Sequence, residues 1–239
     1  MYFRTVVLVF ALAPASLWAQ TAAKSSAVPR MPNGKPDLSG IWVGPFVNDM
    51  TTSLKNQQGS GPLELTDWGK QKKATQVDVS IQCMPSGYTR STNAPFPLEI
   101  EQRPDRIIFL YEMNNNFHHV FLDREHPADL EPTWAGHSIG KWEGDTLVID
   151  TVGFHGKTQL DTQGNPHSEQ LHVVERLTRT DATHMTWEIN IDDPKTYVKP
   201  WKNVRTFTIF PNWELQEYSC NENNKSVVEG HITNGGRPQ

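Results

Sequence analysis

Histidines are concentrated in one part of this 239-residue chain. The segment 118–172 holds seven of them: His118, His119, His126, His137, His155, His167 and His172. Neutral imidazole binds zinc, copper and iron. The spacing matches no established zinc signature, and His118 and His119 would point to opposite faces of a regular strand. A divalent-metal site built from His118 or His119 together with His137 and His172 on adjacent strands is geometrically allowed. The alternative is a set of ordinary, hydrogen-bonded loop and strand histidines.

Three carboxylates alternate with apolar residues along predicted strands: Glu112, Asp150 and Glu175. An acid on an apolar strand face has its charged form disfavoured, which raises its pKa toward the range useful for general acid–base catalysis. The simpler explanation is an ion pair with Arg106 or Arg205 from a neighbouring strand.

Glu112 is the leading catalytic candidate because it lies beside the turn at 114–116 and close in sequence to His118. The predicted catalytic group is Glu112 with His118 or His137, together with Asp150. Such a group would serve an isomerase, lyase or hydrolase without an organic cofactor, with or without a metal.

Aromatic residues suggest a ligand-binding surface instead. The segment 192–201 combines two acids, a proline and two large rings, and the chain has eight tryptophans. Large rings with a few polar groups are typical of small-molecule pockets. The predicted ligand contacts are Trp142, His172, Glu175, Tyr197 and Trp201. The alternative is that Asp193-Pro194 forms a turn and Trp201 closes one end of the fold.

Several functional classes are excluded or disfavoured by missing motifs. The chain has no Gly-x-Ser-x-Gly nucleophile elbow, no phosphate-binding loop and no dinucleotide fingerprint. The formal charge is −5, and removing residues 1–19, whose only charge is Arg4, makes it −6. This acidity and the lack of a basic cluster argue against nucleic acid as a partner.

The N-terminus is typical of a secretory signal. Arg4 precedes a short apolar run, Thr5–Leu12, and Ala19 offers a cleavage point. The run is shorter than the roughly 20 residues that span a bilayer. We expect cleavage after Ala19, a periplasmic or secreted product and no membrane span thereafter; the alternative is an uncleaved anchor.

The polar groups must be positioned by an all-β domain. Short strand-like runs follow one another from residue 98 to residue 220 with turn residues between them and no helical pattern. This predicts an antiparallel meander that closes into a calycin-like β-barrel, because closure removes exposed edges. A β-sandwich is the alternative. One short helix is expected near 65–75, capped by Thr66, and 86–97 is expected to be a loop.

The predicted domain organisation is simple. Residues 20–35 are expected to be a disordered linker, 36–228 a single barrel domain and 229–239 a flexible tail. The clearest local signal is a hairpin in 136–154 with its turn at Glu143-Gly144. Cys83 and Cys220, an even pair in an exported chain, are expected to form a disulfide.

Seven blocks of sequence resemble an uncharacterised family of exported bacterial β-rich proteins. They are PNGKPDLSGIW (32–42), Cys83-x-Pro85-x-Gly87, DRIIFLYEMNN (105–115), HPADLEPTWAGHSIGKWEGDTLVIDTVGF (126–154), PHSEQLHVVER (166–176), DDPKTYVKPW (192–201) and WELQEYSCNENN (213–224). The resemblance implies an envelope or secreted location and no particular activity. A weaker similarity to lipocalin-type barrels lies in Ser39–Trp42.

Three functional hypotheses follow from these observations. The first is a barrel that binds a small apolar or aromatic molecule. The second is the acid–base enzyme, and the third is a structural envelope protein whose barrel is filled by its own side chains. The sequence does not indicate the ligand or the oligomeric state.

Overall fold

A computed structural model describes residues 27–220 of the chain. The proposed signal peptide and the tail at 229–239 lie outside the described residues. Residues 27–35 do not form the expected linker: they fold into a tight turn closed by a bridge between Arg30 and Pro36. This turn contacts the barrel through an ion pair of 2.6 Å between Arg30 and Asp145.

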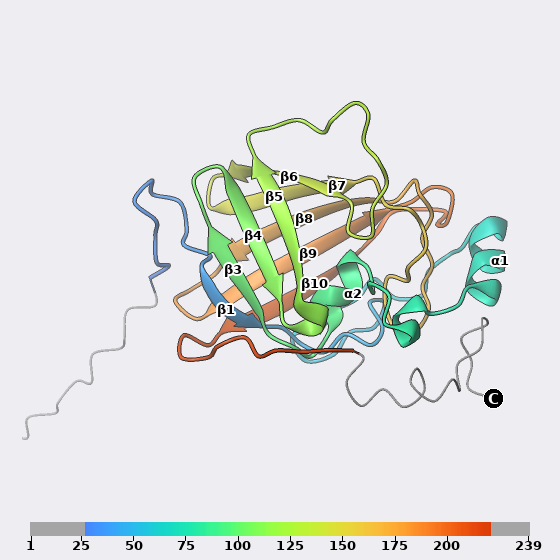
Figure 1. Cartoon of the computed structure of the whole chain (residues 1–239), viewed down its shortest axis with the longest axis horizontal. Coiled ribbons are helices and arrows are strands. Elements are labelled where there is room, and N and C mark those ends of the chain that lie inside the picture. Colours follow the sequence, from blue (N-terminus) through green and yellow to red (C-terminus); the bar gives the residue numbers. More distant parts are fainter. Residues whose placement is uncertain (1–26, 221–239) are drawn as a thin grey trace, which may run out of the picture.

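The core of the fold is a closed nine-stranded β-barrel, which confirms the predicted architecture. In the sheet, β1 pairs with both β3 and β10, so the first and last barrel strands join (Figure 1). The short β2 (Gln57–Gln58) covers the part of β10 that β1 leaves free. The barrel strands are β1 (Gly40–Val43), β3 (Leu98–Gln102), β4 (Arg106–Tyr111), β5 (Asn116–Leu122), β6 (His137–Glu143), β7 (Thr146–Val152), β8 (His172–Arg179), β9 (His184–Asp192) and β10 (Trp201–Ile209).

One pairing departs from the antiparallel meander. β5 and β6 run parallel, with Val120 opposite Ser138. The connecting segment 123–136 therefore runs back along the outside of the barrel from one end to the other, because parallel neighbours require a crossover. The Pro- and His-containing composition of 124–136 indicates a loop but does not reveal the direction of the next strand.

The predicted hairpin of β6 and β7 is present, but its turn lies one residue later than predicted. Glu143 pairs with Thr146, so Gly144 and Asp145 form the two-residue turn in place of Glu143-Gly144. Gly144 has φ +62°, a conformation that glycine adopts without strain. Residues 214–220, the last of the strand-like runs expected between 98 and 220, are irregular in the structure.

Side chains fill the barrel interior. Alternation along the strands turns Phe109, Trp187 and Phe207 inward, and their rings contact one another with centroids 5.1–5.3 Å apart. Trp42, on β1, is fully buried and donates its indole N–H to the carbonyl of Leu38 at 2.8 Å. The interior is therefore a packed core, and open space is confined to the two ends.

A buried helix closes one end of the barrel. The segment 86–97, expected to be a loop, contains α2 (Tyr88–Asn93), and all six of its residues are buried. Gly87 precedes it, where an added Cβ would lie 2.5 Å from the Thr158 hydroxyl. Thr89 and Asn93 bind the carbonyl of Leu160. Its Ser/Thr/Asn composition is typical of loops, and only the surrounding barrel makes it a helix.

The predicted helix near 65–75 is α1 (Asp67–Thr75), which lies outside the barrel (Figure 1). The Thr66 hydroxyl accepts a hydrogen bond from the N–H of Gly69 at 3.0 Å, which is the expected N-cap. Two short 3-10 segments complete the described helices, η1 (Val79–Gln82) and η2 (Met113–Asn115).

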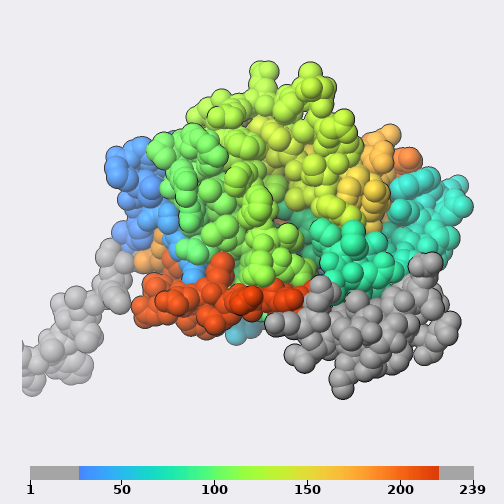
Figure 2. Space-filling view, viewed as in Figure 1, coloured from blue at the N-terminus to red at the C-terminus, as the bar shows by residue number. Residues whose placement is uncertain are grey.

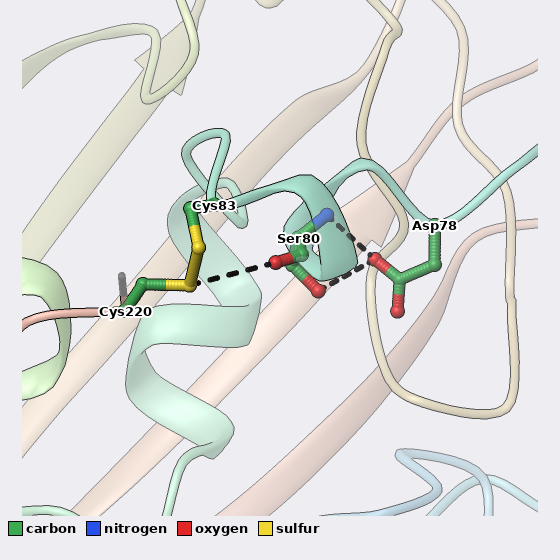
Figure 3. Close-up of a disulfide and its surroundings, with 4 residues drawn as sticks. All are labelled: Asp78, Ser80, Cys83 and Cys220. Atoms are coloured by element: carbon green, nitrogen blue, oxygen red, sulfur yellow. Dashed lines mark hydrogen bonds between the residues drawn. A yellow bond between two sulfur atoms is a disulfide. The ribbon is translucent and has the colours of Figure 1, made fainter. Parts of the chain in front are cut away.

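The predicted disulfide joins Cys83 to Cys220 across 137 positions of sequence (Figure 3). Cys83 follows η1, whose first turn is capped by the Asp78 carboxylate bound to the N–H and hydroxyl of Ser80. The bond holds the C-terminal segment against the end of the barrel that contains α2. Figure 2 shows this segment, in red, lying along the green surface near β4 and β5.

Breaking the disulfide should lower stability. For a loop of this length the chain-entropy model gives about 5 kcal/mol, because the unfolded chain regains conformational freedom. Urea unfolding of a Cys83→Ser/Cys220→Ser variant measures the loss. Dithiothreitol should destabilise the wild type and leave the double variant unchanged; equal effects on both would contradict a structural role for the bond.

Candidate functional site

The most unusual group in the barrel interior is the carboxyl of Glu175 on β8, which is fully buried. The indole N–H of Trp187 donates to its Oε1 at 2.9 Å, and the hydroxyl of Tyr88 donates to its Oε2. Burial raises the pKa of Glu175 to about 7, although both hydrogen bonds and the charge of Arg205 act in the opposite direction. The group can therefore change its protonation state near neutral pH.

Arg205 on β10 is a buried cation close to Glu175 in the same barrel interior. Burial lowers its pKa to about 9, against the attraction of Glu175 and Asp161. Its Nε donates to Asn203 Oδ1 at 2.6 Å, and its Nη1 donates to the carbonyl of Thr92 on α2 at 3.1 Å. The guanidinium thus ties the inserted helix to the barrel wall and supplies positive charge near Glu175.

A small pocket opens at the α2 end of the barrel, with a volume of about 130 Å³. Its lining comes from α2 and the residues before it, from β4 and β5, and from the end of the crossover segment. The lining residues are Pro85, Gly87, Tyr88, Ser91, Tyr111, Asn116, Phe117, His118, Trp134 and Ala135. We call it the α2 pocket.

Tyr111 presents an unsatisfied polar group to this region. The residue is 4% exposed, and its hydroxyl has no hydrogen-bond partner among the described residues. Burial and the nearby Glu175 raise its pKa well above the ordinary value, so the hydroxyl keeps its proton. A buried donor without a partner is costly, and a bound molecule with an acceptor atom would satisfy it.

His118 forms part of the pocket wall as a neutral ring. Its Nε2 lies 2.6 Å from the hydroxyl of Ser138, which in turn lies 2.5 Å from that of Thr151. Burial lowers the pKa of His118 to about 3. The ring centroid lies 4.3 Å from that of Tyr88. His118 therefore contributes a flat, uncharged surface and a hydrogen-bonded chain that leads into the wall of the barrel.

A second group of titratable side chains lies on the outside of the barrel. His126 of the crossover segment contacts His137 (Nδ1 to Nδ1, 2.8 Å) and Asp150 (Nε2 to Oδ1, 3.1 Å), and Asp150 also binds His172 at 2.9 Å. Asp150 raises the pKa of His172, whereas burial and the neighbouring His126 lower that of His137. These contacts fasten the crossover segment to β6, β7 and β8.

The structure separates the three residues of the predicted metal site. His118 points into the barrel, whereas His137 and His172 lie on its outer face, because each strand alternates its side chains. Within residues 27–220 no group of three or more His, Cys, Asp or Glu side chains is arranged to hold a metal ion.

The predicted catalytic group is also dispersed. Glu112, which follows β4, accepts a hydrogen bond from the N–H of Gln216 at 2.8 Å and so holds the C-terminal segment. Asp150 and His137 belong to the outer cluster, and only His118 faces the interior. Alternation along β4 correctly predicts that Glu112 and Tyr111 point to opposite faces of the sheet. It does not show which of these faces is the barrel interior.

The predicted ligand contacts lie at four different places. Glu175 is next to the α2 pocket and His172 is in the outer cluster. Trp142 lines a cup at the opposite end of the barrel. Tyr197 and Trp201 pack together with ring centroids 5.4 Å apart, and the Tyr197 hydroxyl binds the carbonyl of Pro166 at 2.7 Å.

Of the residues that line the pocket, only His118 was among the predicted site residues, and the two tyrosines, Tyr111 and Tyr88, were missed. Tyr111 shares the face of Ile107 and Phe109, so the alternation of β4 contained the signal for it. Tyr88 lies in a segment expected to be a loop, and nothing local in the sequence distinguishes it.

Neither a scan against protein-family models nor a search of curated proteins found a match for this chain. No helix among residues 27–220 is long and apolar enough to cross a membrane. The disulfide is consistent with an exported protein.

The raised pKa of Glu175 predicts a specific pH dependence of stability. Because the folded-state pKa of about 7 exceeds the ordinary 4.5, the folded state binds more protons between these values, and stability falls as pH rises through that window. Relative to Glu175→Gln, the wild type should lose roughly 2 kcal/mol between about pH 5 and pH 7.5.

Urea unfolding of both proteins at several pH values measures this difference. The comparison isolates Glu175, because the buried histidines His118 and His167, whose pKa values are lowered to about 3 and about 4, are present in both proteins. Parallel stability curves for the two proteins would show that Glu175 does not titrate as its burial requires.

Proposed function

We propose that this protein binds a small molecule with one aromatic ring and a hydrogen-bond acceptor in the α2 pocket. The observation that carries the proposal is the buried hydroxyl of Tyr111, a residue that lines the pocket, because this hydroxyl lacks a partner among the described residues. Pockets that combine apolar walls with a few such polar groups are typical binding sites.

The dimensions of the pocket support a ligand of this size. A dry cavity of about 150 Å³ in another protein binds benzene, and the α2 pocket measures about 130 Å³. The rings of Tyr88, His118 and Tyr111 form its inner wall. Phe117, which is 66% exposed, and Trp134 stand at the rim. Rings in these positions favour a flat, largely apolar ligand.

The charge of the site favours a neutral ligand. Glu175 lies behind the wall, bound to Tyr88, and is about half ionised near pH 7. An anionic ligand would meet this partial negative charge in a region of low dielectric. The ligand class is therefore a neutral phenol, aromatic aldehyde or aromatic ketone. Export to the periplasm or the medium, as the N-terminal sequence predicts, would place the protein where such molecules enter the cell.

Binding of phenol and benzene tests the role of Tyr111. The wild type should bind phenol about five- to tenfold more tightly than benzene, because only phenol provides an oxygen for the Tyr111 hydroxyl. Tyr111→Phe should remove this preference and leave benzene affinity unchanged. Isothermal titration calorimetry measures both affinities.

Tyr197→Phe is the matched control, because it removes a buried tyrosine hydroxyl outside the pocket. It should keep the preference for phenol. Tyr111→Phe should be at least as stable as the wild type, since it removes a polar group without a partner. The proposal fails if neither compound binds, or if Tyr111→Phe retains the full preference for phenol.

A second candidate function is acid–base catalysis on the bound molecule. It is favoured by the hydrogen bond between Glu175 and Tyr88, because this bond links a group with a pKa of about 7 to the pocket wall. Ionised Glu175 would take the proton of the Tyr88 hydroxyl while the Tyr88 oxygen takes a proton from the carbon beside the ligand's carbonyl group, which leaves an enolate; reversal of both transfers returns a proton to that carbon. Reactions that move a proton beside a carbonyl group suit this pair. The pair takes the place of Glu112 and a histidine in the sequence-based hypothesis.

Hydrogen exchange of acetophenone in deuterated buffer tests this candidate. The wild type should exchange the methyl protons faster than buffer alone, as followed by proton NMR, and Glu175→Gln should fall to the buffer rate. Glu188→Gln, a change on the outer surface of β9, serves as the control. Equal exchange by the wild type and Glu175→Gln would remove Glu175 from the mechanism.

A further inference from the structure

A second concavity lies at the opposite end of the barrel, where the hairpin turns β3–β4 and β6–β7 meet the N-terminal turn at 30–36. Its volume is about 550 Å³, within the range of roughly 300–1,000 Å³ that is usual for small-molecule sites. It is lined by Met31, Pro32, Asn33, Lys35, Gln102, Arg103, Pro104, Leu122, Asp123, Lys141 and Trp142. We call it the distal cup.

Hydrogen bonds and an ion pair hold the wall of the distal cup in place. The N-terminal turn is closed by a hydrogen bond of 2.9 Å from the N–H of Met31 to the carbonyl of Lys35. Arg30 donates to both carboxylate oxygens of Asp145, at 2.9 and 2.6 Å, and Lys35 Nζ donates to the carbonyl of Gly144 at 3.3 Å. The turn is therefore fastened to the tip of the β6–β7 hairpin and stands over the mouth of the barrel.

The floor of the cup is apolar and continuous with the core. Leu122 and Trp142 are partly buried and pack against the central cluster, so their outer surfaces face the cup. Gln102 is held in place by the N–H of Leu38, which donates to its Oε1 at 2.8 Å. Lys35 Nζ lies 5.9 Å from the centre of the Trp142 ring. A flat molecule placed on Trp142 would meet this ammonium group.

Cations outnumber acids among the residues that line the cup, although Arg103 and Lys141 are each paired with a carboxylate, Glu101 and Glu143. The lining contains the cations Lys35, Arg103 and Lys141 but one acid, Asp123. The other acids nearby are already paired: Glu101 with Arg103 and Glu143 with Arg176 and Lys141. Lys35 forms no direct ion pair among the described residues: its contacts are a backbone carbonyl and the Trp142 ring, and it acts at longer range on Asp145, which is paired with Arg30.

We propose that the distal cup binds an aromatic anion, such as an aryl carboxylate of two fused rings. The ring system would stack on Trp142, beside Met31 and Pro32, and the anionic group would pair with Lys35. Aromatic stacking and a cation beside an apolar floor together favour this class over neutral or cationic rings. The site is separate from the α2 pocket, and the packed core lies between the two.

Calorimetric titration with 2-naphthoate and with neutral 2-naphthylmethanol tests the proposal. The wild type should bind 2-naphthoate about tenfold more tightly than the alcohol, and added salt should weaken naphthoate binding alone. Lys35→Met should lower naphthoate affinity to that of the alcohol. Trp142→Leu should weaken both compounds by a similar factor, because it removes the stacking surface.

Lys70→Met is the matched control, since Lys70 is an exposed lysine of α1 far along the chain from the cup. It should leave naphthoate affinity unchanged, and Tyr111→Phe should as well. Equal losses in Lys35→Met and Lys70→Met would overturn the proposal, as would equal affinity of the wild type for both compounds. Loss of naphthoate binding in Tyr111→Phe would assign the ligand to the α2 pocket and also overturn it.

Discussion

Closure of the sheet through β1 is the constraint on which the rest of the structure depends. This strand has four residues and pairs with β3 on one side and with β10 on the other. Without it, β3 and β10 would be open edges with unpaired backbone groups, which invite association between chains. With it, the barrel becomes a closed surface, and every strand has a defined inner and outer face.

A closed barrel of nine strands leaves an interior that must be filled. Aliphatic side chains and large rings fill most of it, and α2 fills the remaining space at one end. Because the helix brings backbone and hydroxyl groups into the core, the wall must supply polar partners. Arg205 binds the carbonyl of Thr92, and Glu175 accepts the hydroxyl of Tyr88. The unusual pKa of Glu175 is thus a consequence of how the barrel is filled.

The same filling closes the barrel interior, and both the α2 pocket and the distal cup lie at its mouths. At the α2 end the concavity is small and has an unsatisfied hydroxyl and a neutral histidine in its lining. At the other end the concavity is larger, and its lining includes three cations. The outer His126–Asp150 cluster serves a different purpose: it fastens the crossover segment whose last residues, Trp134 and Ala135, form one side of the α2 pocket.

Local patterns in the sequence determined most of the strands, the position of α1 and the chemistry available to each strand. Alternation predicted most of the strands and placed Glu175 among apolar neighbours, Thr66 predicted the cap of α1, and the cysteine pair predicted the disulfide. These features depend on neighbouring residues or on the cellular compartment, so the sequence contains the information directly.

Tertiary structure alone decided which of these residues meet. The register of β5 with β6 turns His118 inward and His137 outward, the register of β8 with its neighbours turns His172 outward, and α2 brings Tyr88 to Glu175 across 87 positions of sequence. Which face of a strand points inward, and whether a polar segment such as 88–93 is buried, depends on contacts between distant parts of the chain. Periodicity shows that a strand has two faces, but only closure of the barrel determines which of them is the interior.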